Sequence, residues 1–131
     1  QVMSSLTTDP VLGHISTFGG HPLSCAAALA SLREIAVPEL RDKVSRQGKL
    51  FMSLLKHPDI RSIRGLGLFI ALEFENEKIN QEVIKRCLAK GVITDWFLFA
   101  PNCLRIAPPL IISDDEIKFA CNTILEALNS L

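Results

Sequence analysis

The sequence lacks several features that would point directly to a class of function. Its 14 basic and 14 acidic side chains cancel, so the overall charge does not predict binding to nucleic acid or to an anionic membrane surface. No apolar run approaches the roughly 20 residues that a membrane-spanning helix needs. The first residues also show no charged and then apolar leader, so we expect no signal peptide within the segment present.

Cysteine and histidine lack the spacing of a redox or metal site. Four cysteines and three histidines are present, with no Cys-x-x-Cys pair and no ligand spacing among the histidines. We therefore expect buried free thiols of the kind usual in a cytosolic protein, and no bound metal. A Ser-His-Asp arrangement or a pair of catalytic carboxylates cannot be argued from the pattern either.

What is present predicts one compact core in a chain of 131 residues. Pro22 to Ile35 is rich in alanine and is expected to form a helix. Pro38 would interrupt that helix but suits the first turn of another. Apolar residues then recur at helical spacing up to His57-Pro58, which predicts a second helix.

The second half alternates short strands with helices. Residues 60–64 and 68–74 are predicted strands around a Gly65-Leu66-Gly67 turn, and a helix follows with Gly91 as its stop. Residues 92–98 and 103–107 are predicted strands joined through Pro101-Asn102. A capping box at residues 113–116 opens the last helix. This order predicts an α+β fold, a small and mostly antiparallel sheet with helices on one face.

The segment from Gly13 to Pro22 contains a Ser16-Thr17 pair and two glycines before the predicted start of a helix. Hydroxyl and backbone donors at such a position suit an anion, since a helix N-terminus carries partial positive charge. The residues alone also allow a contact between subunits or a simple Ser/Thr helix cap.

Arg105 is the second candidate for ligand binding. Strand alternation places Leu104 and Ile106 on one face and Arg105 on the other. Pro108 and Pro109 end the strand, which leaves the guanidinium near the rim of the sheet, where it could bind a carboxylate with two hydrogen bonds. A solvated strand arginine is the alternative. The glycine pair after Arg64 is expected to be a turn and not a nucleotide loop, because a strand follows it.

Three segments together resemble class III, ornithine-type aminotransferases, which use pyridoxal phosphate. The first is the Ser-Thr-Phe-Gly-Gly loop that begins at Ser16. The second is Arg-Gly-Leu-Gly-Leu, from Arg64, and the third is Arg-Ile-Ala-Pro-Pro-Leu, from Arg105. They occur in the order seen in the family and extend over nearly the whole chain. His21 departs from the asparagine that the family often has.

The resemblance implies the C-terminal domain of the pyridoxal-phosphate-dependent transferase fold, preceded by a helix of the large domain, and it also implies an activity and site residues. The parent would transfer an amino group between an amino donor and a 2-oxo acid, as a cytoplasmic homodimer. Thr17 and Ser16 would bind the cofactor phosphate of the neighbouring active site, and Arg105 would bind the α-carboxylate of the substrate. Residues 1–36 would be a remnant of the large cofactor domain, and residues 37–131 the small C-terminal domain. Which amino donor is used stays open.

The family attaches its cofactor to a lysine a short way upstream of the Ser-Thr-Phe-Gly-Gly loop, and no lysine precedes Lys43 here. The chain is therefore expected to be the C-terminal part of an enzyme and to be inactive alone, without bound pyridoxal phosphate. A small ferredoxin-like domain that binds a regulatory ligand is the alternative from another class. That alternative would use residues 60–131 but leaves the loop before Pro22 without a purpose.

Overall fold

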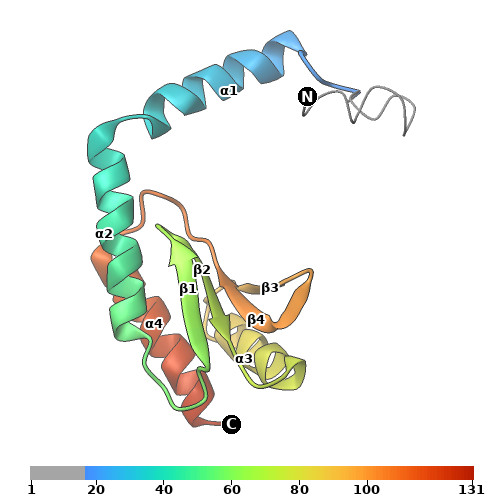
Figure 1. The fold of residues 1–131 in the computed structure, drawn as a ribbon, viewed down its shortest axis with the longest axis vertical. Helices are drawn as coiled ribbons and strands as arrows, with labels where there is room; N and C mark the ends of the chain where they lie inside the picture. Colours follow the sequence, from blue (N-terminus) through green and yellow to red (C-terminus); the bar gives the residue numbers. More distant parts are fainter. Residues whose placement is uncertain (1–16) are drawn as a thin grey trace, which may run out of the picture. The chain divides into compact units, whose positions relative to one another are not determined.

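The computed structural model describes residues 17–131 (Figure 1). The chain divides into two compact units, Gln1–Val37 and Pro38–Leu131, and each is described by itself. In the first unit, a turn at residues 17–20 leads into helix α1 (Pro22–Ile35). Pro22 occupies the first helical turn, where its missing N–H costs nothing. The bounds of this helix are those predicted.

The second unit forms an α+β structure of three helices and one four-stranded sheet. The predicted fold class is confirmed. Its sheet is antiparallel throughout, with the strand order β1-β2-β4-β3. The elements in chain order are α2 (Pro38–Leu54), β1 (Ser62–Leu66), β2 (Phe69–Glu73), α3 (Glu77–Ala89), β3 (Asp95–Phe97), β4 (Ala100–Ile106) and α4 (Asp114–Asn129).

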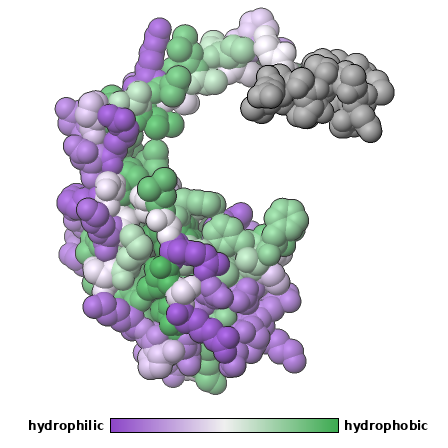
Figure 2. Space-filling model, in the orientation of Figure 1, coloured by the Kyte–Doolittle hydropathy of each residue, from purple (hydrophilic) through white to green (hydrophobic). Residues whose placement is uncertain are grey.

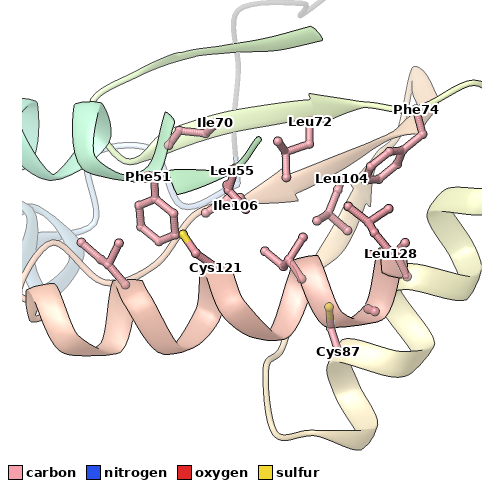
Figure 3. Packing of buried hydrophobic residues seen from close by; sticks show 14 of the residues in the cluster. Phe51, Leu55, Ile70, Leu72, Phe74, Cys87, Leu104, Ile106, Cys121 and Leu128 are labelled. Carbon is pink, nitrogen blue, oxygen red and sulfur yellow. The ribbon is translucent and has the colours of Figure 1, made fainter. Parts of the chain in front are cut away.

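All three helices of this unit contribute to a single core on one face of the sheet (Figure 3). Alternate strand residues face them, because successive side chains of a strand point to opposite sides. The fully buried side chains of the core include Phe51 of α2, Ile70 and Leu72 of β2, Val83 of α3, Leu104 of β4, and Ile117 and Ile124 of α4. Within Pro38–Leu131 no helix covers the other face of the sheet, which we call the open face (Figure 1).

The two hairpin turns lie away from their predicted positions. The first turn is at residues 67–68, where Gly67 has φ of +56°, so Gly65 and Leu66 belong to β1. The second turn is at residues 98–99 and not at Pro101-Asn102, which lie inside β4. A register shift between Trp96 and Phe97 leaves Pro101 beside an irregularity, where a residue without an N–H is tolerated.

The capping box of α4 is confirmed. Ser113 Oγ accepts from the Glu116 N–H at 3.2 Å, and the Glu116 carboxylate accepts in return from the Ser113 N–H at 2.7 Å. The backbone N–H of Ser113, and then its hydroxyl, lower the pKa of the Glu116 carboxyl. The Glu116 carboxyl is therefore held in its ionised form, and a negative charge at the N-terminus of α4 is what the helix dipole favours.

The order of elements rules out the ferredoxin-like alternative. From Ser62 onward it is two strands, a helix, two strands and a helix. The ferredoxin-like arrangement instead runs strand, helix, two strands, helix, strand. That alternative is therefore wrong for residues 60–131.

Candidate functional site

Two arginines and a carboxylate lie in one row across the open face of the sheet. Ala71 of β2 pairs with Arg64 of β1 on one side and with Arg105 of β4 on the other. Arg105 in turn pairs with Asp95 of the edge strand β3. Directly paired residues of neighbouring strands project to the same face. The row therefore brings the two arginines to one face of the sheet, where only the small side chain of Ala71 on β2 lies between them.

Arg105 is anchored to the neighbouring strand through Asp95. Its Nη2 atom donates to Asp95 Oδ2 at 2.9 Å, and the two side chains are 41% and 46% exposed. Thr94 Oγ1 also donates to the carbonyl oxygen of Arg105 at 2.7 Å, which fixes the strand backbone. Within residues 17–131 the bond to Asp95 is the single hydrogen bond of the Arg105 guanidinium. Most of its five N–H donors can therefore serve a ligand.

Arg64 is held more completely than Arg105. Its Nη1 atom donates to Glu73 Oε2 and to Ser62 Oγ, and its Nη2 atom lies 3.3 Å from the sulfur of Cys103. The hydrogen bond from Arg64, followed by the one from Ser62, lowers the pKa of the Glu73 carboxyl. The bond to Glu73 likewise raises the pKa of Arg64. With these partners, Arg64 is the more structural of the two arginines.

A pocket of about 420 Å³ lies over this row. Arg64, Ala71 and Arg105 form its floor and sides, and the remaining lining is apolar: Phe97, Leu98, Phe99 and Ala100. Leu98 and Phe99, at the tip of the β3–β4 hairpin, are 78% and 96% exposed, and this tip is apolar on the molecular surface (Figure 2). Positive side chains beside apolar walls suit a small organic anion.

Another hollow, of about 380 Å³, lies between β4, the segment before β3, and α4. Its lining includes Val92, Ile106 and Phe119, and no charged side chain is among the residues around it. It offers no charged group that could pair with a carboxylate. The pocket over the arginine row is therefore the better candidate for a polar substrate.

Thr17 begins the turn before α1. It is exposed, and the turn is closed by the His21 N–H, which donates to the carbonyl oxygen of Phe18 at 3.1 Å. Gly20 has φ of +76°, a conformation that glycine adopts without strain. His21 is the N-cap residue of α1, and its side chain makes no capping hydrogen bond. Thr17 is therefore not the helix cap that the sequence allowed. Ser16 lies outside the described residues.

The remaining polar groups provide few other candidates. Among residues 17–131, no group of three or more His, Cys, Asp or Glu side chains is placed to hold a metal ion. Lys43 is half-buried, and the other six lysines of the chain are exposed. No helix in this described range is long and apolar enough to span a membrane. The four cysteines are free, Cys25 exposed and the others buried.

Sequence reasoning predicted the face of the sheet on which Arg105 lies but not the residues around it. Alternation along β4 was predicted correctly, because Leu104 and Ile106 are buried in the core while Arg105 lies on the open face. The position of Asp95 opposite Arg105 was missed, because a strand predicted from residue 92 does not say which of its residues pairs with which residue of β4. Alternation along residues 95–97 could have placed Asp95 and Phe97 on one face of the strand, but the pairing of β3 with β4 is visible only in three dimensions.

Comparison with known proteins identifies the family. The Aminotransferase class-III profile matches residues 1–128. The acetylornithine aminotransferase of Haemophilus ducreyi is 40% identical over 119 residues, which cover 90% of this chain and 29% of that protein. The ornithine aminotransferase of Bordetella pertussis is 35% identical over an alignment of 136 positions, which covers 97% of this chain and 33% of that protein. The chain thus spans about a third of the length of these relatives.

Solved structures agree in fold. An aminotransferase of Bacillus anthracis superposes with a TM-score of 0.79 at 28% identity, over 99% of this chain and 34% of that one. The ornithine aminotransferase of Toxoplasma gondii gives 0.75 at 31% identity, over 92% and 30%. The chain belongs to the class III aminotransferases, a family of enzymes that depend on pyridoxal phosphate.

Proposed function

We propose that this chain is the C-terminal part of an aminotransferase that transfers an amino group between an amino donor and a 2-oxo acid. The observation that carries the proposal is the Arg105 guanidinium, which lines a partly apolar pocket and has donors to spare. Amino donors with an α-carboxylate and 2-oxo acids share one feature, a carboxylate next to the reacting carbon. A planar guanidinium binds such a group with two parallel hydrogen bonds and so fixes its orientation.

The substrates we propose follow from the relatives. Acetylornithine, ornithine and putrescine appear in the names of aminotransferases similar to this chain. 4-Aminobutyrate and lysine remain open as donors as well. Arg105 would bind the carboxylate next to the reacting carbon, which the 2-oxo acid carries and which N-acetylornithine, 4-aminobutyrate and putrescine lack at the carbon that reacts. The distal end of each would be recognised by groups outside the pocket described above.

The turn before α1 fits a phosphate group. Thr17 is exposed, and the side chain of the N-cap residue His21 makes no hydrogen bond to the first N–H groups of α1. A phosphate oxygen could therefore accept from the Thr17 hydroxyl and from the helix N-terminus. We propose that Thr17, with Ser16, holds the phosphate of pyridoxal phosphate. When bound, this cofactor supplies the carbonyl group that takes up the amino group of the donor.

Further properties of the parent protein are proposed from the family. It would be a homodimer in which the Thr17 loop contributes to the neighbouring active site. Residues 1–36 would belong to the large cofactor domain and residues 37–131 to the small domain. Free cysteines support a cytoplasmic location, where thiols stay reduced.

The direct test uses the complete protein from which this chain would derive. Purified with pyridoxal phosphate, it is expected to transfer an amino group from ornithine or N-acetylornithine to 2-oxoglutarate, measured as glutamate formed. The chain of 131 residues is expected to show no turnover. The cofactor lysine of the family lies upstream of the Ser-Thr-Phe-Gly-Gly loop, whereas all lysines of this chain lie downstream of it. Turnover by the chain alone would contradict the fragment proposal. Failure of the complete protein with every donor named above would contradict the function.

A further inference from the structure

We propose that Asp95 is a positioning residue, which holds the guanidinium of Arg105 in the orientation that receives a substrate carboxylate. This inference rests on the carboxylate role proposed for Arg105 and adds a residue to it. Nothing in the sequence motifs includes Asp95, and its place opposite Arg105 follows from the pairing of β3 with β4.

Both oxygens of Asp95 are engaged, so the carboxylate is itself fixed. Its Oδ1 atom accepts from the Trp96 N–H at 2.8 Å, which locks the side chain against its own strand. Its Oδ2 atom accepts from Arg105 Nη2 at 2.9 Å. A flexible arginine side chain loses considerable rotamer freedom when a ligand immobilises it. A partner that already holds one end of the guanidinium removes part of that loss before substrate binds.

Asp95 holds Arg105 from outside the pocket. The residues that line the pocket include Arg64 and Arg105 but neither of their carboxylate partners, Glu73 and Asp95. Both arginines thus border the space where a substrate would lie, and their carboxylate partners do not. A group that competed with substrate for Arg105 would be expected to occupy the pocket itself.

The single bond between Asp95 and Arg105 leaves room for a second carboxylate. It uses Nη2, and no hydrogen bond from Nη1 or Nε of Arg105 to residues 17–131 is found. A substrate carboxylate needs two adjacent N–H groups for a forked interaction. Arg64, by contrast, spends its two Nη atoms on three partners. This difference assigns the positioning role to the Asp95–Arg105 pair and not to the Arg64–Glu73 pair.

The test compares two donors that differ only in the α-carboxylate. Glutamate carries it on the carbon whose amino group is transferred, and 4-aminobutyrate is glutamate without it. In single-turnover half-reactions of the complete aminotransferase, Asp95→Ala is expected to lower the apparent second-order rate constant for glutamate roughly tenfold, since a loosened guanidinium is misplaced. The rate constant for 4-aminobutyrate is expected to stay within about twofold, because that donor has no carboxylate on the reacting carbon.

A matched control is available in the same unit. Glu75 forms an exposed ion pair with Arg61 at 2.9 Å, and neither residue lines the pocket. Glu75→Ala removes a carboxylate from a comparable pair and is expected to change neither rate constant by more than about twofold. If Asp95→Ala does not fold, as judged by circular dichroism, Asp95→Asn serves instead. Asparagine has an NH2 donor in place of one carboxylate oxygen, so Trp96 and Arg105 no longer each have an acceptor oxygen of their own.

The outcomes separate this inference from the proposals beneath it. An equal loss with both donors would show a general structural role and would overturn the positioning role. Faster reaction with glutamate would show that Asp95 competes with substrate, which also overturns it. If Arg105→Lys discriminates between the donors while both Asp95 variants do not, the inference alone fails. If Arg105→Lys does not discriminate either, the carboxylate role of Arg105 fails, and an inactive wild-type enzyme would refute the function.

Discussion

Arg105 and Thr17 would act on different molecules, so their substitution is expected to have different effects. In the complete enzyme, Arg105→Lys keeps the charge but loses the fork that matches a carboxylate. The loss of a charge-assisted pair at a partly exposed site is expected to cost about 2–4 kcal/mol, or roughly 30- to 1000-fold in kcat/KM. This loss should appear with every donor that carries a carboxylate on the reacting carbon and with the 2-oxo acid, while cofactor affinity stays near that of wild type.

Thr17→Ala provides the complementary measurement. It should weaken retention of pyridoxal phosphate, measured by equilibrium dialysis, before it alters the KM for the donor. An Arg105→Lys enzyme whose kcat/KM stays within about twofold of wild type, or one that loses cofactor, would contradict the carboxylate role.

The cysteines are predicted to differ in reactivity because of their surroundings. Burial raises the pKa of the Cys87 thiol to about 11 and that of the Cys121 thiol to about 12, whereas Cys25 is exposed. The reactive species is the thiolate, which these two buried groups do not form near pH 8. Iodoacetamide is therefore expected to label Cys25 much faster than Cys87 or Cys121, as followed by peptide mass spectrometry. Denaturant should equalise the rates, and equal rates in the folded chain would contradict the prediction.

At the scale of elements, helix α2 and the β1–β2 hairpin approach closely at two glycines. A Cβ atom at Gly48 of α2 would collide with the backbone carbonyl of Gly67, which has positive φ in the hairpin turn. Gly48→Ala should gain about 1 kcal/mol of helix propensity. Separating packed backbones costs more than this gain, typically about 1–3 kcal/mol and sometimes more. We therefore expect a net loss of unfolding free energy in urea denaturation.

The neighbouring residue provides the control for this close contact. Lys49 is exposed in the same helix, and Lys49→Ala should change the unfolding free energy by no more than about 0.5 kcal/mol. A Gly48→Ala variant as stable as wild type would show that the hairpin can move away from α2 without cost.

The elements also show how far the sequence predicts this fold. Local signals were sufficient for the helices, since Pro22, Pro38 and the Ser113–Glu116 capping box mark helix starts by short-range chemistry. The strands were placed less well, because their ends depend on pairing. Pro101 was predicted to lie in a turn, but the irregular pairing of β3 and β4 accommodates it inside β4. The face on which Arg105 lies could be predicted from alternation along its strand. The position of Asp95 beside it depends on the register between two strands, which alternation does not give.

At the scale of the whole molecule, the hydrophobic core belongs to the second unit. All of its buried members lie between Phe51 and Leu128, and the residues packed against them begin at Val44. The sheet and helices α2, α3 and α4 lie in the same unit, Pro38–Leu131. Stability that comes from burial of apolar surface should therefore reside in this part of the chain.

Removal of residues 1–37 is expected to leave a folded protein that starts at the Pro38 end of α2. Proline suits the first helical turn, so the new terminus should not fray the helix. Because the core stays complete, we expect cooperative thermal unfolding with a Tm within about 4 °C of the longer chain, which corresponds to less than about 1 kcal/mol in a domain of this size. Calorimetry of both chains measures this difference directly. A broad, uncooperative transition of the shorter chain would show that residues 1–37 belong to the same folding unit, and the proposed domain boundary would then be wrong.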